Sequence, residues 1–321
     1  MTSLSGITPS GHVQLGNYLG AVQRWARETT PDDLYFVSDL HAMTSAHNPA
    51  KLRALTRETL AILLAAGIDP DLVFVQSDLL AEHASMTWVL ECVCTFGEAR
   101  RMIQFKEKSK GESGVRLSLL TYPVLMVADI LLYGTDKVPV GADQAQHVEL
   151  ARALAKRFNT QYGEVFVVPE LVLPPAAARV RDLADPTRKM AKSARDSAGV
   201  VFVLDSPDLI RRKIGRAVTD GLGKVAYDPE GQPGVANLLE ILAGCTGERP
   251  EDLAEQTGDY AGLKSRVAEA VIEELREIRK RTLELIDDRA ELDRIRAAGA
   301  QRARERAQPR LAAALRMAGL G

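Results

Sequence analysis

The sequence contains few cysteines and no long apolar run. Its 321 residues include three cysteines, Cys92, Cys94 and Cys245, and their spacing fits neither a metal cluster nor a disulfide framework. A reducing compartment is therefore favoured. No stretch is long enough for a membrane span, and the first residues do not have the pattern of a signal peptide. We expect a cytoplasmic protein without a membrane partner and without a metal held by its own side chains.

The chain also has almost no net charge. Its 41 Lys and Arg residues nearly balance 43 Asp and Glu residues, which leaves a formal charge of −2. This balance excludes a protein that coats nucleic acid through bulk positive charge, although a local basic patch is compatible with it. Hydrophobic residues make up 46% of the chain and charged residues 26%, as in ordinary globular proteins of two domains.

Short apolar runs alternate with helical patterns from residue 1 to about residue 183. Strands are predicted at residues 34–38, 72–76, 137–140 and 165–168, and helices at residues 15–28, 49–66, 86–94 and 144–158. Such alternation predicts an α/β fold with parallel strands and right-handed crossovers. In these folds the ligand crevice lies beyond the carboxyl ends of the strands, where Ser10, Asp39 and Gly141 are expected.

One apolar segment contains a carboxylate. Residues 122–132 predict a buried helix, preceded by an extended piece at Tyr122-Pro123. Burying Asp129 in such a helix is costly unless a partner satisfies its carboxylate. Asp129 could pair within the core, which is the commoner outcome for an arbitrary Asp, or it could line a ligand pocket.

The second half of the chain is predominantly helical. Helices are predicted at residues 208–218, 235–242, 250–256 and 263–287, and one strand at residues 200–204. We predict a Rossmann-type domain over 1–188 with a helical insertion at about 96–132, an all-helical domain over 189–289, and a basic helical tail over 290–321 that packs back on the body. The tail has seven arginines between Arg294 and Arg316, which predict either a solvated helix face or phosphate contacts.

Turn residues precede a helical pattern near the start of the chain. Pro9, Ser10 and Gly11 are followed by Leu15, Leu19 and Val22 at helical spacing. A helix start offers unpaired N–H groups that suit a phosphate, and Gly16 and Gly20 would let a flat ring approach the backbone. The stretch has neither a Gly-rich dinucleotide fingerprint nor a Gly-Lys-Ser/Thr phosphate loop, so a simple turn and packed helix is an equal alternative.

A second stretch, Lys189-Met190-Ala191-Lys192-Ser193, favours the nucleotide site over the simple turn. Together with Gln14-Leu15-Gly16-Asn17 it resembles the two signatures of class I aminoacyl-tRNA synthetases, usually written KMSKS and HIGH. The segments between them, in the same order, resemble tryptophanyl-tRNA synthetases: residues 39–44, 104–109, 122–131 and 138–144. The resemblance covers nearly the whole chain.

The resemblance implies a two-step reaction. Tryptophan and ATP would give tryptophanyl-adenylate and pyrophosphate, and the tryptophanyl group would then pass to tRNA. Because the attacking group is the substrate's own carboxylate, the protein would contribute positioning and charge stabilisation. Mg²⁺ would accompany ATP through the phosphates and water. Homodimerisation is implied by the family alone.

The resemblance also implies roles for individual residues. The cations that neutralise the leaving pyrophosphate would be Lys189, Lys192 and Lys108. The amino acid would be surrounded by Asp129, Tyr122, Met126, His41 and Gln144, with the Asp129 carboxylate accepting the indole N–H. The ATP site would be formed by Thr8, Pro9, Ser10, Gly16, Asn17, Gly141, Ala142, Asp143, Val180, Lys189, Met190, Ala191, Lys192 and Ser193.

Four positions depart from the family pattern. Thr8 replaces the usual Gln before Pro-Ser-Gly, and Gln14 replaces the Thr or His that opens the HIGH-like motif. Ala142 replaces the usual Glu, and Ala191 replaces the middle Ser of KMSKS. Each change alters a hydrogen-bonding group, which suggests an auxiliary or inhibitor-resistant form. The alternatives are a tyrosyl-type synthetase, a catalytically impaired paralogue that binds tRNA, and an enzyme that passes activated tryptophan to another acceptor.

Overall fold

A parallel sheet lies at the centre of the molecule. The computed structural model describes residues 2–108, 114–173, 180–191 and 197–320, with backbone only for Lys108, Ala142 and Ser197. Strands β1 (Leu4–Ile7), β2 (Leu34–Val37) and β3 (Val73–Val75) pair in that order, and β4 (Lys137–Pro139) pairs with β5 (Glu170–Val172). A parallel bridge between Ser3 and Lys137 places β4 beside β1. The overall order is therefore β5-β4-β1-β2-β3, as expected for an α/β fold.

Side chains of each strand alternate between two hydrophobic cores. Tyr35 and Val37 of β2 point into one core, whereas Leu34 and Phe36 point into the other, because successive strand residues face opposite sides. The second core contains a stacked pair of rings, Phe36 and Phe74, whose centroids lie 5.4 Å apart. Helices must therefore cover both faces of the sheet.

Helices of the first half pack around this sheet. Their bounds are α1 (Leu15–Asn17), the π-helical η1 (Tyr18–Val22), α2 (Gln23–Glu28), α3 (Asp39–Ala42), α4 (Pro49–Ala65), η2 (Pro70–Leu72), η3 (Gln76–Leu79), α5 (Leu80–Glu91), α6 (Phe96–Arg101), α7 (Ile103–Lys108), α8 (Leu117–Leu132), η4 (Ala142–Gln144) and α9 (Ala145–Tyr162). Helices α1, η1 and α2 follow one another without a break, so the predicted helix at residues 15–28 is confirmed, although its middle is π-helical.

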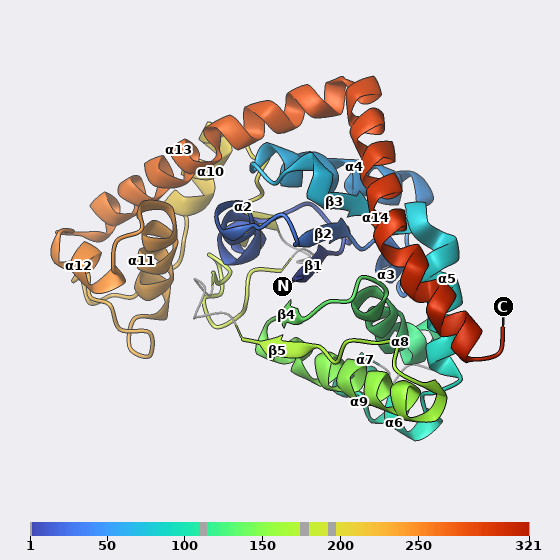
Figure 1. Ribbon diagram of the computed structural model, residues 1–321. Coiled ribbons are helices and arrows are strands. Elements are labelled where there is room, and N and C mark those ends of the chain that lie inside the picture. The colour runs from blue at the N-terminus through green and yellow to red at the C-terminus, as the bar shows by residue number, and fades with distance from the viewer. Residues whose placement is uncertain (1, 109–113, 174–179, 192–196, 321) are drawn as a thin grey trace.

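The described residues of the second half of the chain form helices joined by loops. These helices are η5 (Ser197–Gly199), α10 (Pro207–Gly215), α11 (Pro233–Thr246), α12 (Pro250–Glu255), α13 (Tyr260–Asp287) and α14 (Arg289–Met317). Figure 1 shows α13 leading from α11 and α12 over the sheet domain to the start of α14, which then runs down past α5. The domain division at residues 188/189 and 289/290 stays a prediction.

Three local predictions were wrong. Residues 165–168 form no strand, and β5 begins instead at Glu170. Tyr122 and Pro123 lie inside α8, because packing of this helix against α5 overrides the preference of a pre-proline residue for extended backbone. Residues 200–204 form no strand but pair locally, with an isolated antiparallel bridge between Phe202 and Gln14.

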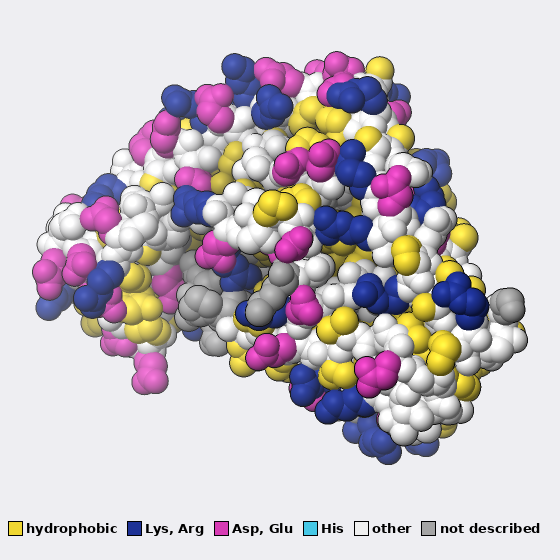
Figure 2. Space-filling view, viewed as in Figure 1, with side chains coloured by type: hydrophobic (Ala, Val, Ile, Leu, Met, Phe, Trp, Pro, Cys, Tyr) yellow, Lys and Arg dark blue, Asp and Glu magenta, His cyan; other side chains and the backbone are white. Residues whose placement is uncertain are grey.

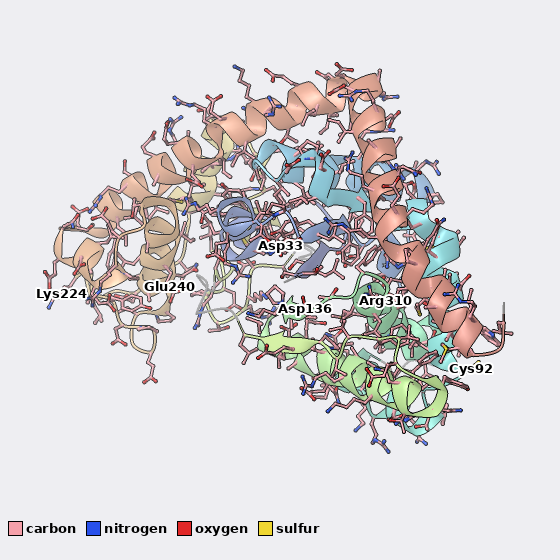
Figure 3. The ribbon with its side chains drawn as sticks, viewed as in Figure 1. Asp33, Cys92, Asp136, Lys224, Glu240 and Arg310 are labelled. Atoms are coloured by element: carbon pink, nitrogen blue, oxygen red, sulfur yellow. The ribbon has the colours of Figure 1, made fainter. Side chains whose placement is uncertain are left out.

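Arginines of α14 attach this helix to the sheet domain. Figure 2 shows charged side chains of both signs distributed over α13 and α14. Arg306 nevertheless donates to the carbonyls of Pro31 and Asp32, and Arg310 donates to Leu132 O from α14 toward the end of α8 (Figure 3). Arg302 pairs with Asp71 at 2.9 Å. These three arginines bond to the protein itself and attach the tail to the sheet domain, while the predicted phosphate contacts stay a prediction.

The close approach of α14 to β3 gives a test of this packing. A Cβ added at Gly299 would lie 2.1 Å from Val73 O, whereas one added at Gly97 in α6 would meet only Arg101 Nη1 at 3.5 Å. We therefore expect Gly299→Ala to lower the free energy of unfolding by about 1–3 kcal/mol, the usual cost of overpacking. Gly97→Ala should be neutral or slightly stabilising, since Ala favours helix. Urea unfolding of both variants measures this difference. Equal unfolding midpoints for Gly299→Ala and Gly97→Ala would contradict the close contact between α14 and β3.

No helix of the described chain is both long and apolar enough to cross a membrane.

Candidate active site

The strand order reverses between β1 and β4. The chain moves from β1 outward to β2 and β3, and later from β4 outward to β5. Ligands of open α/β sheets bind at such a switch point, beyond the carboxyl ends of the strands. The residues that follow β1, β2 and β4 are therefore expected to share one crevice.

A cavity of about 680 Å³ lies at this point. Its walls include Thr8, Pro9 and Ser10 after β1, and His41 after β2. All five residues expected around the amino acid also line it: Asp129, Tyr122, Met126, His41 and Gln144. The volume falls within the range of ordinary small-molecule sites.

Asp129 is buried in this wall, and both of its carboxylate oxygens have partners. Only 2% of it is exposed. Its Oδ1 accepts from Gln76 Nε2 at 2.7 Å and lies 2.8 Å from His83 Nδ1, while its Oδ2 lies 2.7 Å from His41 Nε2. The carboxylate thus pairs within the core and also lines the cavity, so the two sequence-based interpretations do not exclude each other, and its role in ligand binding stays a prediction.

The partners of Asp129 keep it ionised. Burial alone would raise its pKa, but hydrogen bonds and opposite charge from His41 and His83 outweigh burial and lower the pKa to about 2. A carboxylate can accept about four hydrogen bonds; Gln76 and His41 supply one each at 2.7 Å, and His83 Nδ1 faces Oδ1 as an ion-pair partner at 2.8 Å. One lone pair of Oδ2 thus remains for a donor that enters the cavity.

Tyr122 forms a second polar cluster in the same wall. Its hydroxyl donates to Gln104 Oε1 at 3.0 Å and lies 3.1 Å from His147 Nε2. Burial raises the pKa of Tyr122 to about 12, so the phenol stays neutral. Its ring meets the His41 ring edge-on, with 6.2 Å between centroids. Apolar rings and one ionised carboxylate together suit a flat aromatic ligand with a single N–H.

The two signature segments touch through Gln14. This residue is 2% exposed, and its side-chain oxygen caps α1 by accepting from Gly16 N and, at 3.3 Å, from Asn17 N. Its Nε2 donates to Met190 O at 2.8 Å. Gln14 thus links the start of α1 to the Lys189–Ala191 segment.

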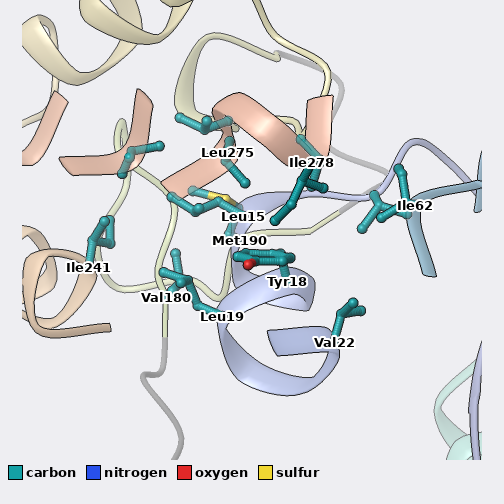
Figure 4. Packing of buried hydrophobic residues seen from close by; sticks show 14 of the residues in the cluster. Leu15, Tyr18, Leu19, Val22, Ile62, Val180, Met190, Ile241, Leu275 and Ile278 are labelled. Atoms are coloured by element: carbon teal, nitrogen blue, oxygen red, sulfur yellow. The ribbon is translucent and has the colours of Figure 1, made fainter. Parts of the chain in front are cut away.

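Gly16 does not face open space in this structure. A Cβ at Gly16 would lie 3.1 Å from the Val180 Cβ, so the Val180 side chain covers the face where a flat ring was predicted to lie. Val180 O accepts from Met190 N at 3.2 Å. Figure 4 shows Val180 and Met190 among the buried side chains around Leu15 and Tyr18. This part of the predicted ATP site is packed shut.

The remaining predicted ATP residues lie in different surroundings. Lys189, Ala191, Gly141 and Asp143 are exposed. The Asn17 Oδ1 atom is buried and has no hydrogen-bond partner among the described residues, which is consistent with an atom held for a ligand. Lys192 and Ser193 lie outside the described residues, and the side chains of Lys108 and Ala142 are not described.

Sequence reasoning missed the residues that support the site. Gln76 and His83 hold Asp129, and Gln104 and His147 hold Tyr122. Gln76 directly follows β3, and the rule that ligand residues follow strands could have identified it. His83 carried no local signal, since a single His in a helix is usually structural.

The chain is similar to known proteins over nearly its whole length. The family model described as tRNA synthetases class I (W and Y) matches residues 1–276. The chain is 54% identical to tryptophan–tRNA ligase 1 of Streptomyces coelicolor, over 98% of this chain and 96% of that protein. The crystal structure of tryptophanyl-tRNA synthetase from Mycoplasma pneumoniae superimposes with a TM-score of 0.87 at 35% identity, covering 100% of this chain and 98% of that one. The Campylobacter jejuni enzyme complexed with ADP and tryptophan gives 0.84 at 31% identity, with 100% of both chains covered.

Proposed function

Because the chain belongs to the tryptophanyl-tRNA synthetases of class I, we propose that it activates L-tryptophan with ATP and transfers the tryptophanyl group to the 3′ end of its tRNA. The observation that carries this proposal is the ionised Asp129 in the wall of the cavity, beside Tyr122 and Met126. Indole has one N–H, and the free lone pair of Asp129 Oδ2 would accept it. A site built around that donor rejects analogues that lack it. Charging of tRNA for protein synthesis fits the expected cytoplasmic location.

In the first step, a carboxylate oxygen of tryptophan would attack the α-phosphorus in line. The new O–P bond forms as the bridging bond to the β-phosphate breaks, and pyrophosphate leaves with the electron pair. Lys189 would neutralise the departing charge, together with Lys192 and Lys108. In the second step, a hydroxyl at the tRNA 3′ end attacks the carbonyl carbon and AMP leaves.

ATP would contact Thr8–Ser10, Asn17 and the segments at 141–143 and 189–193. Since Val180 lies against Gly16 and Gln14 bonds to Met190, we propose that these contacts loosen when the nucleotide binds. Mg²⁺ would be held through the ATP phosphates and water, as is usual for this ion. The ion would supply additional positive charge at the leaving group.

ATP–pyrophosphate exchange tests the reaction. We expect exchange with tryptophan and none with tyrosine, followed by charging of the cognate tRNA. Exchange with tyrosine alone would favour the tyrosyl-type alternative. Without exchange on either amino acid, the impaired paralogue would become the leading interpretation. Exchange with tryptophan but no tRNA charging would favour an enzyme that passes activated tryptophan to an acceptor other than tRNA.

The four departures support an auxiliary or inhibitor-resistant form. Thr8 lines the cavity and its hydroxyl lies 2.9 Å from Ser38 Oγ, while Gln14 occupies the start of α1. We expect a tryptophan-like inhibitor to require a higher concentration here than with an ordinary family member. Equal inhibition of exchange by both proteins would contradict the resistant form.

A second copy of the chain is the proposed partner of an exposed apolar surface. Helices α5 to α8, which contact one another, carry Leu80, Trp88, Phe96, Ile103 and Leu117 with 54–72% of each exposed. We propose that these side chains form one interaction surface, since a large exposed apolar patch usually marks such a surface. We expect light scattering to give twice the 34.9 kDa of one chain. Trp88→Glu should shift the mass to the monomer, whereas Leu222→Glu, in a loop elsewhere, should leave the dimer intact. A monomeric wild type would contradict this proposal.

A further inference from the structure

Three consecutive residues of the short turn η3 each form a different long-range hydrogen bond. Gln76 Nε2 donates to Asp129 Oδ1 at 2.7 Å, and Gln76 Oε1 accepts from Leu40 N at 3.1 Å. Ser77 donates to Asp39 through its backbone N at 2.9 Å and through Oγ at 2.6 Å. Asp78 points the other way, toward α14. The orientation of Gln76, and with it that of Asp129, therefore depends on how this turn is held.

Helix α14 holds η3 through a bidentate ion pair. Arg296 Nε and Nη2 each donate to one Asp78 carboxylate oxygen at 2.7 Å. Only 33% of the Arg296 side chain and 24% of the Asp78 side chain are exposed, so water screens the pair incompletely. A bidentate guanidinium–carboxylate pair fixes direction as well as distance. Arg296 thus restrains the residue two positions after Gln76.

A second arginine of α14 holds the other partner of Asp129. Arg304 Nε donates to Glu82 Oε1 at 2.8 Å, and its Nη2 donates to Asp78 O at 2.7 Å. Glu82 is 7% exposed and directly precedes His83, which lies 2.8 Å from Asp129 Oδ1. Both residues that contact Oδ1 thus lie in segments that α14 holds through guanidinium groups.

Resting on the proposed function, we infer that Arg296 and Arg304 are positioning residues of the tryptophan site. They keep Gln76 and His83 aimed at Oδ1, which leaves Oδ2 for His41 and the indole N–H. Without these arginines, α14 no longer restrains η3 and the start of α5, the two segments that contain Gln76 and His83. Tryptophan should then bind less tightly, while ATP, whose predicted contacts follow other segments, should not be affected.

The chain offers a matched control in Arg306. Its guanidinium also attaches α14 to the sheet domain, through the carbonyls of Pro31 and Asp32, but it contacts neither η3 nor α5. Arg306→Ala should loosen α14 about as much as the other substitutions do. An effect that follows helix docking in general would therefore appear in all three variants, whereas an effect on the pocket would appear only in Arg296→Ala and Arg304→Ala.

The experiment measures tryptophan binding by calorimetry, the KM values for tryptophan and ATP in pyrophosphate exchange, and the melting temperature of each full-length variant. Arg296→Ala and Arg304→Ala should weaken tryptophan binding about 3- to 10-fold, with an equal rise in its KM and an unchanged KM for ATP. Arg306→Ala should lower the melting temperature without changing either KM. Arg296→Lys, which keeps the charge but not the bidentate geometry, should fall between wild type and Arg296→Ala.

Two results would overturn the inference: an unchanged affinity for tryptophan in both variants, or the same weakening in Arg306→Ala. If Arg296→Ala or Arg304→Ala does not fold, the tryptophan affinity of Arg296→Lys tests the inference instead. A wild-type protein that binds tryptophan but catalyses no exchange would contradict the proposed function alone, and calorimetry would still decide on the positioning role. A wild type that binds no tryptophan would contradict both.

Discussion

Asp129→Asn is expected to lower kcat/KM for tryptophan by about 10²-fold or more. The substitution removes the charge that accepts from Gln76 and His41 and faces His83. It also turns one oxygen into a donor that opposes these groups. Hydrogen bonds to charged groups contribute about 1.5–3 kcal/mol, and 1.36 kcal/mol corresponds to tenfold in rate. Pyrophosphate exchange at varied tryptophan measures the effect.

Asp136→Asn provides the control for this change. Asp136 is likewise a hydrogen-bonded carboxylate, since its Oδ2 accepts from Thr2 N at 2.8 Å, but it is not among the residues that line the cavity. Figure 3 shows it near the start of β4. We expect this variant to keep the KM for tryptophan, and Asp129→Asn to keep the KM for ATP. If Asp129→Asn changed kcat/KM for tryptophan less than twofold, Asp129 would be a structural residue only.

Lys189→Ala is expected to lower kcat of exchange by roughly 10²–10³-fold with little change in the KM for tryptophan. Interactions made with charge that develops in the transition state affect kcat most strongly. Lys189 is exposed and lies within a hairpin, in which it forms an isolated antiparallel bridge with Arg181 and Asp182 N bonds to Arg188 O at 3.0 Å. Its amine is therefore available to a phosphate. Single-turnover formation of the adenylate measures the step directly.

The neighbouring Arg188 serves as the comparison. Its side chain is 81% exposed and pairs at 3.0 Å with Asp185, three residues earlier. Arg188→Ala removes the same charge one position away, so it should change the rate less than about twofold, as expected for an exposed pair. Equal losses in both variants would indicate a general electrostatic effect of this segment rather than a specific role of Lys189.

Much of the sheet could be predicted from hydrophobic periodicity. The predicted strands at 34–38, 72–76 and 137–140 coincide with β2, β3 and β4 to within one residue at each end. The prediction at 165–168 failed, since an apolar run shows that a segment is buried but not that it forms strand hydrogen bonds. The same reasoning explains residues 200–204, which are buried or partly buried and pair only locally.

The prediction of an extended Tyr122-Pro123 failed because it weighed only local preferences. Pro123 lies in the middle of α8 and is buried, where contacts with α5 and α9 compensate for its missing N–H. Local propensity is a weak guide wherever a segment is packed on several sides. The consequence matters for function, because a continuous helix places Tyr122, Met126 and Asp129 along one face toward the cavity.

The sequence by itself determined the parallel α/β core, the segments that follow its strands and the burial of Asp129, because these features follow from apolar spacing within a few residues. Only the tertiary structure decided the partners of these segments. Gln76 lies 53 residues from Asp129, Gln14 lies 176 from Met190, and Arg296 lies 218 from Asp78. Hydrogen bonds between such distant residues form only after the chain has packed, since directional contacts require distances that local patterns do not encode. Packing therefore directs the arginines of the tail toward the protein's own carboxylates and carbonyls.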